Sequence, residues 1–268
     1  MEPAAPPSHA PLAMTPPPRA FALPFATRAS IFVRLLAIQA SWNYEILLGN
    51  GIAFCTEPAL RLLPGGRGGE AYRAALARHS QYFNAHPYLA GVAVGALVRA
   101  ELDGEAPARI ERFRTALCGP LGSVGDRLVW AAWLPFCSLV ALLAFGLGAG
   151  AVAVVVGFLV LYNIGHIALR AWALSVGLSR GMKVAQALGA PVLRQGPQWL
   201  SQAAAFIGGA GLPLALARVI GPGRTLLGSV VVAVMVGAVV MNRLHGRLEG
   251  WRLALAALVA YVLYSIAR

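Results

Sequence analysis

Charged side chains are scarce in this sequence, and their scarcity excludes most soluble folds. Only 12% of the 268 residues are Asp, Glu, Lys or Arg, whereas 58% are hydrophobic. Soluble domains average about 25% charged residues, because a surface in contact with water needs them. A lipid-facing surface excludes charge, so this composition is typical of a membrane protein.

The sequence also lacks the residue groupings that metal sites, disulfide frameworks and self-contained active sites require. Its three cysteines, Cys55, Cys118 and Cys137, are far apart, and it contains no CxxC pair and no cluster of histidines. This spacing favours neither a zinc site nor a disulfide framework. The sequence has no phosphate-binding glycine loop and no nucleophile–base pairing, so we expect no cofactor and no independent catalytic site.

Acidic residues are fewer than basic ones, which gives the chain a formal net charge of +12. Nucleic-acid binding would need these positive charges together on one soluble face. The basic residues lie instead between apolar runs, where they set membrane topology and attract anionic lipid. The sequence therefore predicts a protein of the lipid bilayer that binds no nucleic acid.

The chain divides by composition into three regions. Residues 1–27 are rich in proline and have no long apolar core, which predicts a disordered cytoplasmic tail rather than a secretory signal. Residues 28–127 hold most of the acidic side chains and a short apolar run at 88–98. A run of this length favours a cytoplasmic helical region or helices that dip part-way into the membrane. Residues 128–268 form the predicted transmembrane region.

Long uncharged stretches in this last region predict about five transmembrane helices. No charged residue lies between Arg127 and Arg170, a gap that suits two spans of about 20 residues each. Glycines at 146, 148 and 150 suit a tight turn between these two spans. Further apolar segments cover residues 201–217, 226–241 and 253–267.

The distribution of arginine predicts the orientation of these spans. Twelve arginines precede the first span, and the polar loops expected at 170–200 and 242–252 are also basic. Cytoplasmic loops carry the excess of Lys and Arg, so we expect the N-terminus in the cytoplasm and the C-terminus outside. The predicted fold class is all-α, a polytopic membrane protein with about five transmembrane helices after a cytoplasmic or re-entrant helical region.

Five polar side chains are candidates for substrate contact or gating. Gln39 and Asn43 lie four residues apart, on the polar face of a helix predicted from apolar residues recurring over 31–46. The others, Asn84, His86 and Asp126, lie at predicted helix boundaries near the membrane, where an ionisable residue is a functional candidate.

Each candidate also has a structural interpretation, and both interpretations stay open. Asn84 and Asp126 suit the caps of the helices that follow them. Gln39 and Asn43 suit hydrogen bonds to a neighbouring helix or to a partner subunit. Asn163 and His166, three residues apart, are interpreted as a polar pair near the membrane interface.

Residues 119–126, which read GPLGSVGD, are predicted to form a loop. Glycine recurs every three residues around Pro120, and each glycine costs about 1 kcal/mol in a helix relative to alanine. Such density favours a non-helical backbone or a close approach by another chain. We expect this loop at the cytoplasmic mouth of a pathway, with Asp126 accepting hydrogen bonds there.

Three stretches of the sequence together resemble the hallmark segments of one family. Residues 39–43 read QASWN, residues 83–88 read FNAHPY, and residues 119–126 read GPLGSVGD. In order and spacing they are similar to segments of the enzyme IID subunit of the mannose/fructose/sorbose phosphotransferase family. The similarity covers residues 28–200.

This resemblance implies a sugar-transport subunit in the bacterial inner membrane. A IID subunit pairs with a IIC subunit to form the channel for a hexose, and the pairs assemble into a higher oligomer. Soluble IIA and IIB domains relay phosphate to the incoming sugar, so no phosphorylated residue is expected on this chain. A second function also stays open, that of a diverged paralogue with a regulatory or scaffolding role and no transport.

Overall fold

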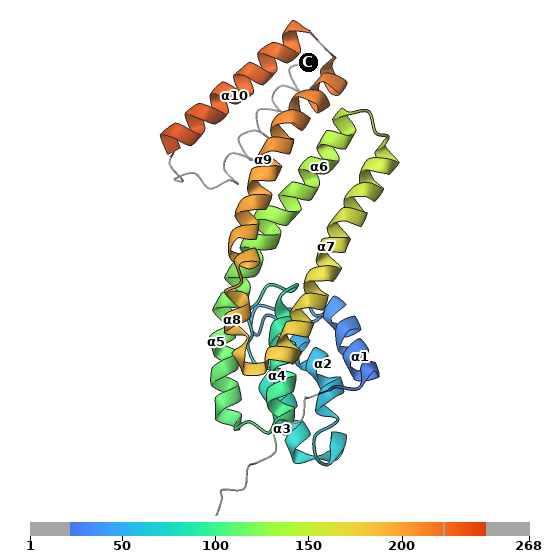
Figure 1. Cartoon of the computed structure of the whole chain (residues 1–268), viewed down its shortest axis with the longest axis vertical. Coiled ribbons are helices and arrows are strands. Elements are labelled where there is room, and N and C mark those ends of the chain that lie inside the picture. The colour runs from blue at the N-terminus through green and yellow to red at the C-terminus, as the bar shows by residue number, and fades with distance from the viewer. Residues whose placement is uncertain (1–21, 222, 245–268) are drawn as a thin grey trace, which may run out of the picture. The chain divides into compact units, whose positions relative to one another are not determined.

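The computed structural model describes residues 22–221 and 223–244, and every regular element in these ranges is helical (Figure 1). The all-α prediction is therefore confirmed for the described chain. Two short 3-10 turns, η1 and η3, and one π-helix, η2, accompany the α-helices. In chain order the elements are α1 (Phe25–Leu36), α2 (Gly49–Leu60), η1 (Gly66–Gly68), α3 (Glu70–His79), α4 (Ala90–Leu102), α5 (Pro107–Gly125), η2 (Asp126–Trp133), α6 (Leu134–Gly146), α7 (Ala151–Arg180), η3 (Gly181–Lys183), α8 (Ala185–Leu188), α9 (Pro191–Ile220) and α10 (Arg224–Leu244).

The described chain folds into two compact units. Unit 1 comprises the chain up to Leu128 together with Gly165–Arg194, and unit 2 comprises Val129–Ile164 together with the chain after Arg194. α7 therefore begins in unit 2 and ends in unit 1, so its C-terminal half packs with helices that come much earlier in the sequence.

Three helical segments are long and apolar enough to cross a membrane. They are Pro107–Gly146, Ala151–Lys183 and Ala185–Ile220. α10 adds a shorter apolar stretch, Leu227–Gly237. The fifth predicted span, at residues 253–267, lies outside the described residues.

The polar loop predicted over residues 170–200 is wrong for most of its length. α7 continues to Arg180 and α9 begins at Pro191, so only a short connection remains between them. Arg170 does not end the helix because the residue is only 3% exposed and its guanidinium is hydrogen-bonded inside unit 1. The glycine turn predicted between the first two spans is correct, since α6 ends at Gly146 and α7 begins at Ala151.

α4 is the core helix of unit 1. Every residue from 90 to 98 is buried, and α4 packs against α2, α5 and the end of α7. A Cβ atom on Gly95 would lie 2.6 Å from the backbone nitrogen of Leu178, so only glycine permits this approach to α7. Small residues serve this purpose wherever helix backbones come close. The short apolar run at 88–98 is therefore a buried core segment.

Glu57, on α2, joins four elements of unit 1. Its carboxylate accepts two hydrogen bonds from Arg61 at 2.7 Å, and one each from Arg34 at 3.0 Å, Arg67 at 3.3 Å and Tyr72 at 3.1 Å. These donors, Arg61 above all, lower the pKa of Glu57 to about 2 against the opposing effect of burial. In the folded protein the carboxylate therefore stays ionised at pH values well below the usual pKa of a glutamate side chain.

Glu57→Gln should lower the free energy of unfolding at neutral pH by about 1–3 kcal/mol, because charged hydrogen bonds are lost. The pKa of Glu57 falls from 4.5 to about 2 on folding. Its stabilisation is therefore complete above about pH 5 and is lost as the pH falls toward 2. Thermal unfolding in detergent should lose stability across this window in the wild type and less in Glu57→Gln. The exposed Glu111→Gln is the control, and equal slopes in wild type and Glu57→Gln would contradict the assignment.

Within unit 2, α6 and α9 run parallel and pack closely (Figure 1). A Cβ atom on Gly211 would lie 3.2 Å from Leu143, and one on Gly146 would lie 2.8 Å from the nitrogen of Ala215. Arg218 donates hydrogen bonds to the carbonyl oxygens of Phe145 and, at 2.9 Å, Ala149. The turn after α6 and the end of α9 therefore lie at the same end of unit 2.

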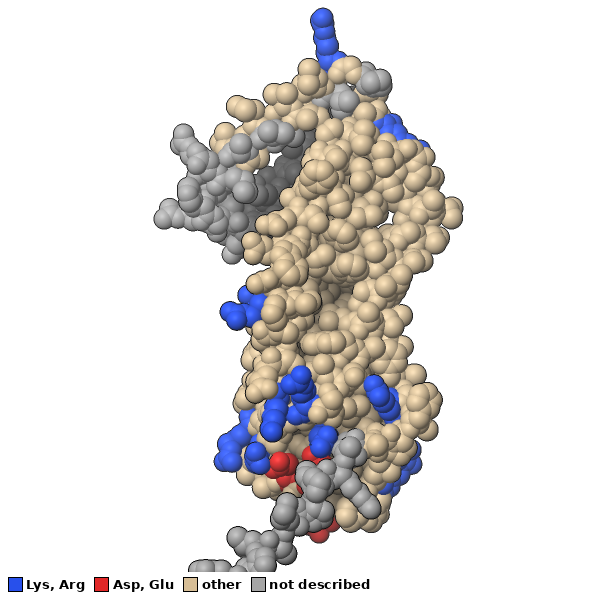
Figure 2. All heavy atoms as spheres, viewed as in Figure 1, with Lys and Arg blue, Asp and Glu red and all other residues tan. Residues whose placement is uncertain are grey.

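The two units differ in the chemistry of their surfaces. On the face drawn in Figure 2, Lys and Arg gather over the helices of unit 1, whereas the helices of unit 2 present mostly uncharged atoms. Large apolar side chains of unit 2 are exposed, among them Phe206 at 81% and Val152 at 77%. Such exposure of apolar side chains suits contact with lipid.

Candidate functional site

The three stretches singled out in the sequence meet within unit 1. We call this region the motif junction and define it as residues 43–48, 83–88 and 119–126. The N–H of Phe83 donates to the carbonyl of Ile46 at 3.1 Å, and the N–H of Leu48 donates to the carbonyl of Phe83 at 3.0 Å. These two bonds join the second stretch to the chain that directly follows QASWN.

The second stretch also lies against the end of α5. The N–H of His86 donates to the carbonyl of Leu121 at 3.4 Å. A Cβ atom on Gly125 would lie 2.1 Å from the Cβ of His86, and one on Gly122 would lie 4.0 Å from the amide nitrogen of Asn84. The side chains of Asn84 and His86 therefore lie beside glycine positions of GPLGSVGD, and at Gly125 no other residue fits.

The loop predicted at residues 119–126 is wrong, because α5 is helical through Gly125 with Pro120 inside it. The prediction weighed only the low helix propensity of glycine. Contact with His86 explains why position 125 is glycine within the helix, since a helix can approach another segment this closely only where no side chain intervenes. Gly119 has no heavy atom within 4 Å of its Cβ position, so packing does not explain that glycine.

An irregular backbone does occur, directly after the glycines. Asp126 begins the π-helix η2, and π-helical turns are rare and frequently lie at functional sites. Asp126 is exposed, and in the described residues its carboxylate forms no hydrogen bond or ion pair. Its predicted role as an acceptor for sugar or for a gate therefore stays a prediction.

Asn84 and Asp126 both lie near the C-terminal end of α5. Asn84 is exposed and lies beside Gly122, and Asp126 follows Gly122 by four residues. Two of the five predicted candidates are therefore exposed near the end of α5, and a third, His86, is buried against Gly125.

His86 is buried, with 1% exposure, and burial chiefly lowers its pKa to about 4, with a smaller contribution from the positive charge of Arg170. Its Nδ1 accepts a hydrogen bond from the N–H of Tyr88 at 3.2 Å. His86 is therefore neutral at physiological pH, with its proton on Nε2. His86 orders the second stretch, and its exposed neighbours would make any contact with a solvated sugar.

Three further residues of this region were not among the predicted site residues: Tyr88, His166 and Arg170. The ring of Tyr88 lies 4.9 Å from the ring of His86 and 4.4 Å from that of His166, with the guanidinium of Arg170 over it at 4.8 Å. Arg170 donates to Nε2 of His166 at 2.8 Å and to the carbonyl of Leu35. The sequence contained one signal for this contact, because His166 and Arg170 are four residues apart and so lie on the same face of a helix.

Gln39 and Asn43 do not lie on a helix, contrary to the prediction. α1 ends at Leu36, and the side-chain oxygen of Asn43 accepts the N–H groups of Glu45 and Ile46, each at 3.0 Å. Asparagine side chains can take backbone N–H groups that a helix would use for its own hydrogen bonds. This explains why the apolar periodicity over 31–46 wrongly predicted a continuous helix. Asn43 therefore holds a turn. Gln39 is exposed, and within the described chain no hydrogen bond joins its side chain to the other four candidates.

The turn that Asn43 holds leads to a strained residue. Leu47 has a φ of 50°, the one positive value at a non-glycine residue in the described chain, and it pairs with both Asn43 and Phe83. Such a backbone costs about 1–3 kcal/mol and persists only where the surroundings impose it. The strain lies where the first and second stretches join, and side-chain pattern alone carries no signal for it.

The chemistry available at the motif junction is hydrogen bonding. An exposed amide can donate to and accept from the hydroxyl groups of a sugar, and an exposed carboxylate can accept from them. Among the described residues there is no group of three His, Cys, Asp or Glu side chains able to hold a metal ion. The arrangement suits recognition or passage of a polar solute.

Comparison with known sequences gives consistent matches. A family profile described as "PTS system mannose/fructose/sorbose family IID component" matches residues 23–210. The mannose-specific EIID component of the PTS system of Escherichia coli (strain K12) is 29% identical over 209 residues, which is 70% of each chain. The fructose permease IID component of Bacillus subtilis (strain 168) is 31% identical over 170 residues, 59% of this chain and 58% of that one.

Two solved structures share the fold. One chain of the mannose transporter ManYZ in complex with microcin E492 aligns with 92% of this chain and 96% of its own length, with a TM-score of 0.55. A structure described only as a membrane protein aligns with 91% of this chain and 96% of its own, with a TM-score of 0.67. Both are 23% identical in sequence, so they bear on the fold alone.

Proposed function

Because the chain belongs to the mannose/fructose/sorbose family of PTS IID components, we propose that it forms the translocation pathway for a hexose together with a IIC subunit. It is the IID membrane component of a mannose-family sugar permease. In this proposal a IIB domain phosphorylates the sugar after receiving phosphate from IIA. The chain itself contributes binding and passage and carries no phosphorylated residue.

One observation carries the proposal to particular residues. The exposed amide of Asn84 lies beside Gly122, and the exposed Asp126 follows at the end of the same helix, where the neutral His86 packs against Gly125. A sugar needs such groups in a fixed arrangement, and the close packing at Gly125 holds them. We assign Asn84 and Asp126 to the sugar or to its gate, and His86 to positioning them.

The proposal includes the course of the chain through the bacterial inner membrane. Five spans cross it within residues 128–268, after a cytoplasmic tail at 1–27 and a cytoplasmic or re-entrant region at 28–127. The hydrogen bonds of Arg218 to the turn after α6 support this order, because alternating spans put the end of the first span, α6, and the end of the third span, α9, on the same outer side. The N-terminus then lies in the cytoplasm.

The IIC partner has a suitable surface on this chain. Tyr44 is 88% exposed and Trp42 is 43% exposed, and their rings contact each other edge to face at 4.8 Å. The turn held by Asn43 presents both rings, and aromatic residues are enriched where subunits meet. We assign this turn to contact with IIC, and we expect IIC–IID pairs to assemble into a higher oligomer.

Asp126→Asn tests the proposal directly, because it keeps the shape of the side chain and removes its charge. Uptake of hexose per molecule of protein in the membrane should fall about tenfold or more, the effect of losing a charged hydrogen bond. Arg127→Gln, at the neighbouring exposed position, is the control and should leave uptake near the wild-type value. Unchanged uptake in Asp126→Asn, or equal losses of uptake and abundance, would show that Asp126 has a structural role in the helix and no role in sugar contact or gating.

A further inference from the structure

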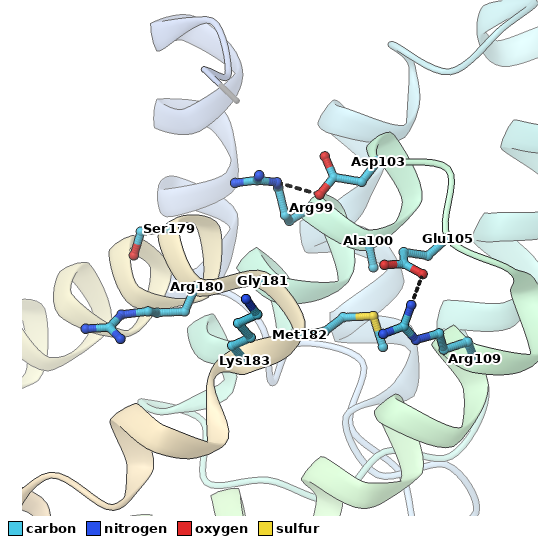
Figure 3. A pocket seen from close by; sticks show the side chains of 10 residues that line it. All are labelled: Arg99, Ala100, Asp103, Glu105, Arg109, Ser179, Arg180, Gly181, Met182 and Lys183. Atoms are coloured by element: carbon cyan, nitrogen blue, oxygen red, sulfur yellow. Dashed lines mark hydrogen bonds and ion pairs between the residues drawn. The ribbon is translucent and has the colours of Figure 1, made fainter. Parts of the chain in front are cut away.

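Unit 1 contains a pocket of about 370 Å³ away from the motif junction (Figure 3). Three segments line it: the end of α4, the start of α5, and the end of α7 with η3. Arg99 crosses between two of them, since its guanidinium donates to the carbonyl of Leu178 at 3.4 Å. The lining residues are Arg99, Ala100, Asp103, Glu105, Arg109, Ser179, Arg180, Gly181, Met182 and Lys183.

The charges of this pocket do not cancel. Asp103 pairs with Arg99 at 2.7 Å, and Glu105 pairs with Arg109 at 2.7 Å, so both acids are neutralised by arginines four residues away. Figure 3 marks these two pairs with dashed lines. Arg180 and Lys183 form no ion pair within the described residues, which leaves a surplus of two positive charges.

The position of these two residues in the chain is also informative. Lys183 ends the apolar helical segment Ala151–Lys183, whose 33 residues extend about 50 Å at 1.5 Å per residue. A bilayer with its headgroups is about 40–45 Å thick, so this end of the segment reaches the polar surface of the membrane. An anion can approach there from the water or from the lipid headgroups. Lys183 is moreover the only lysine in a chain whose other basic residues are arginine.

We propose that this pocket binds a phosphate group, either as a free phosphate anion or as the headgroup of an anionic phospholipid. Arg180 and Lys183 supply the uncompensated positive charge, and lysine and arginine are the usual partners of phosphate oxygens. The two ion pairs hold the walls of the pocket so that its acids do not repel the anion. Basic pockets at the cytoplasmic ends of membrane helices bind phosphate headgroups for the same reason.

The single lysine makes the proposal measurable on the full-length protein. An amine-reactive ester modifies Lys183 and the N-terminal amine, and peptide mass spectrometry separates the two. In phosphatidylcholine nanodiscs, inorganic phosphate should slow the modification of Lys183 about fivefold or more, beyond the effect of chloride at equal ionic strength. If the headgroup is the ligand, phosphatidylglycerol in the nanodisc should slow it instead, and free phosphate should not.

Arg180→Gln should abolish either form of protection, whereas Arg194→Gln, an exposed arginine outside the pocket, should keep it. Normal thermal unfolding of both variants would exclude misfolding as the cause. The N-terminal amine reports any general change in reactivity. The proposal is overturned if neither phosphate nor phosphatidylglycerol protects Lys183, or if protection is the same in Arg180→Gln as in Arg194→Gln.

Discussion

Gly125→Ala should destabilise the protein more than any other single methyl group added to α5. The new Cβ atom would lie 2.1 Å from the Cβ of His86, a separation that real structures do not tolerate. Overpacking of this kind costs about 1–3 kcal/mol. His86 is held in place, because its N–H donates to Leu121 and its Nδ1 accepts the N–H of Tyr88. We expect a lower melting temperature in detergent and a loss of uptake, both measured against the amount of protein in the membrane.

The matched control is Gly119→Ala, on the same helix. Its Cβ position has no heavy atom within 4 Å, so the added methyl should be neutral or stabilising by up to about 1 kcal/mol through helix propensity. His86→Gly removes the atom that clashes, so Gly125→Ala should cost less in that background than in the wild type. Equal effects of Gly125→Ala and Gly119→Ala would show that the second and third stretches do not pack as described.

Arg170→Ala should release α1 from the rest of unit 1. Arg170 is 3% exposed, and it joins the carbonyl of Leu35 at the end of α1 to His166 on α7 and to the ring of Tyr88. Removing the guanidinium deletes charged hydrogen bonds to the carbonyl of Leu35 and to His166 in a buried setting, a loss of about 2–5 kcal/mol. Arg170→Lys keeps the charge but not the planar fork of donors, so it should rescue only part of the loss.

Limited trypsin digestion distinguishes local release from general unfolding. Cleavage after Arg28 and Arg34, both on α1, should be about tenfold faster or more in Arg170→Ala than in the wild type, because local opening exposes that helix first. Arg194→Ala, which removes an exposed arginine, should leave the rate unchanged. Acceleration at all sites alike would contradict a specific link between α7 and α1.

Uncharged stretches and glycine positions predicted the features that depend on neighbouring residues in the chain. The uncharged gap before Arg170 indicated two spans, and the glycines around 148 indicated the turn between them. Each of these features follows from local composition, because a bilayer rewards any helix of sufficient length and apolarity.

Contacts between distant residues account for what the sequence could not predict. Gly125 is helical because His86, which lies 39 positions earlier, packs against it. Arg170 stays inside a helix because its guanidinium donates a hydrogen bond to the carbonyl of Leu35. The left-handed backbone of Leu47 depends on its pairing with Phe83. Local propensity contains no information on these partners, although the matching order of the three stretches indicated that they belong together.

Sugar uptake by cells that lack a mannose-family permease tests the proposed function most directly. The IIC, IIA and IIB proteins from the organism that encodes this chain are expressed with and without it, and accumulation of radiolabelled mannose, fructose and sorbose is followed. We predict phosphorylated sugar inside the cell only when this chain is present, together with its recovery alongside IIC in mild detergent. The same uptake without the chain, or no uptake with it despite normal abundance of all subunits, would contradict a role in the sugar pathway.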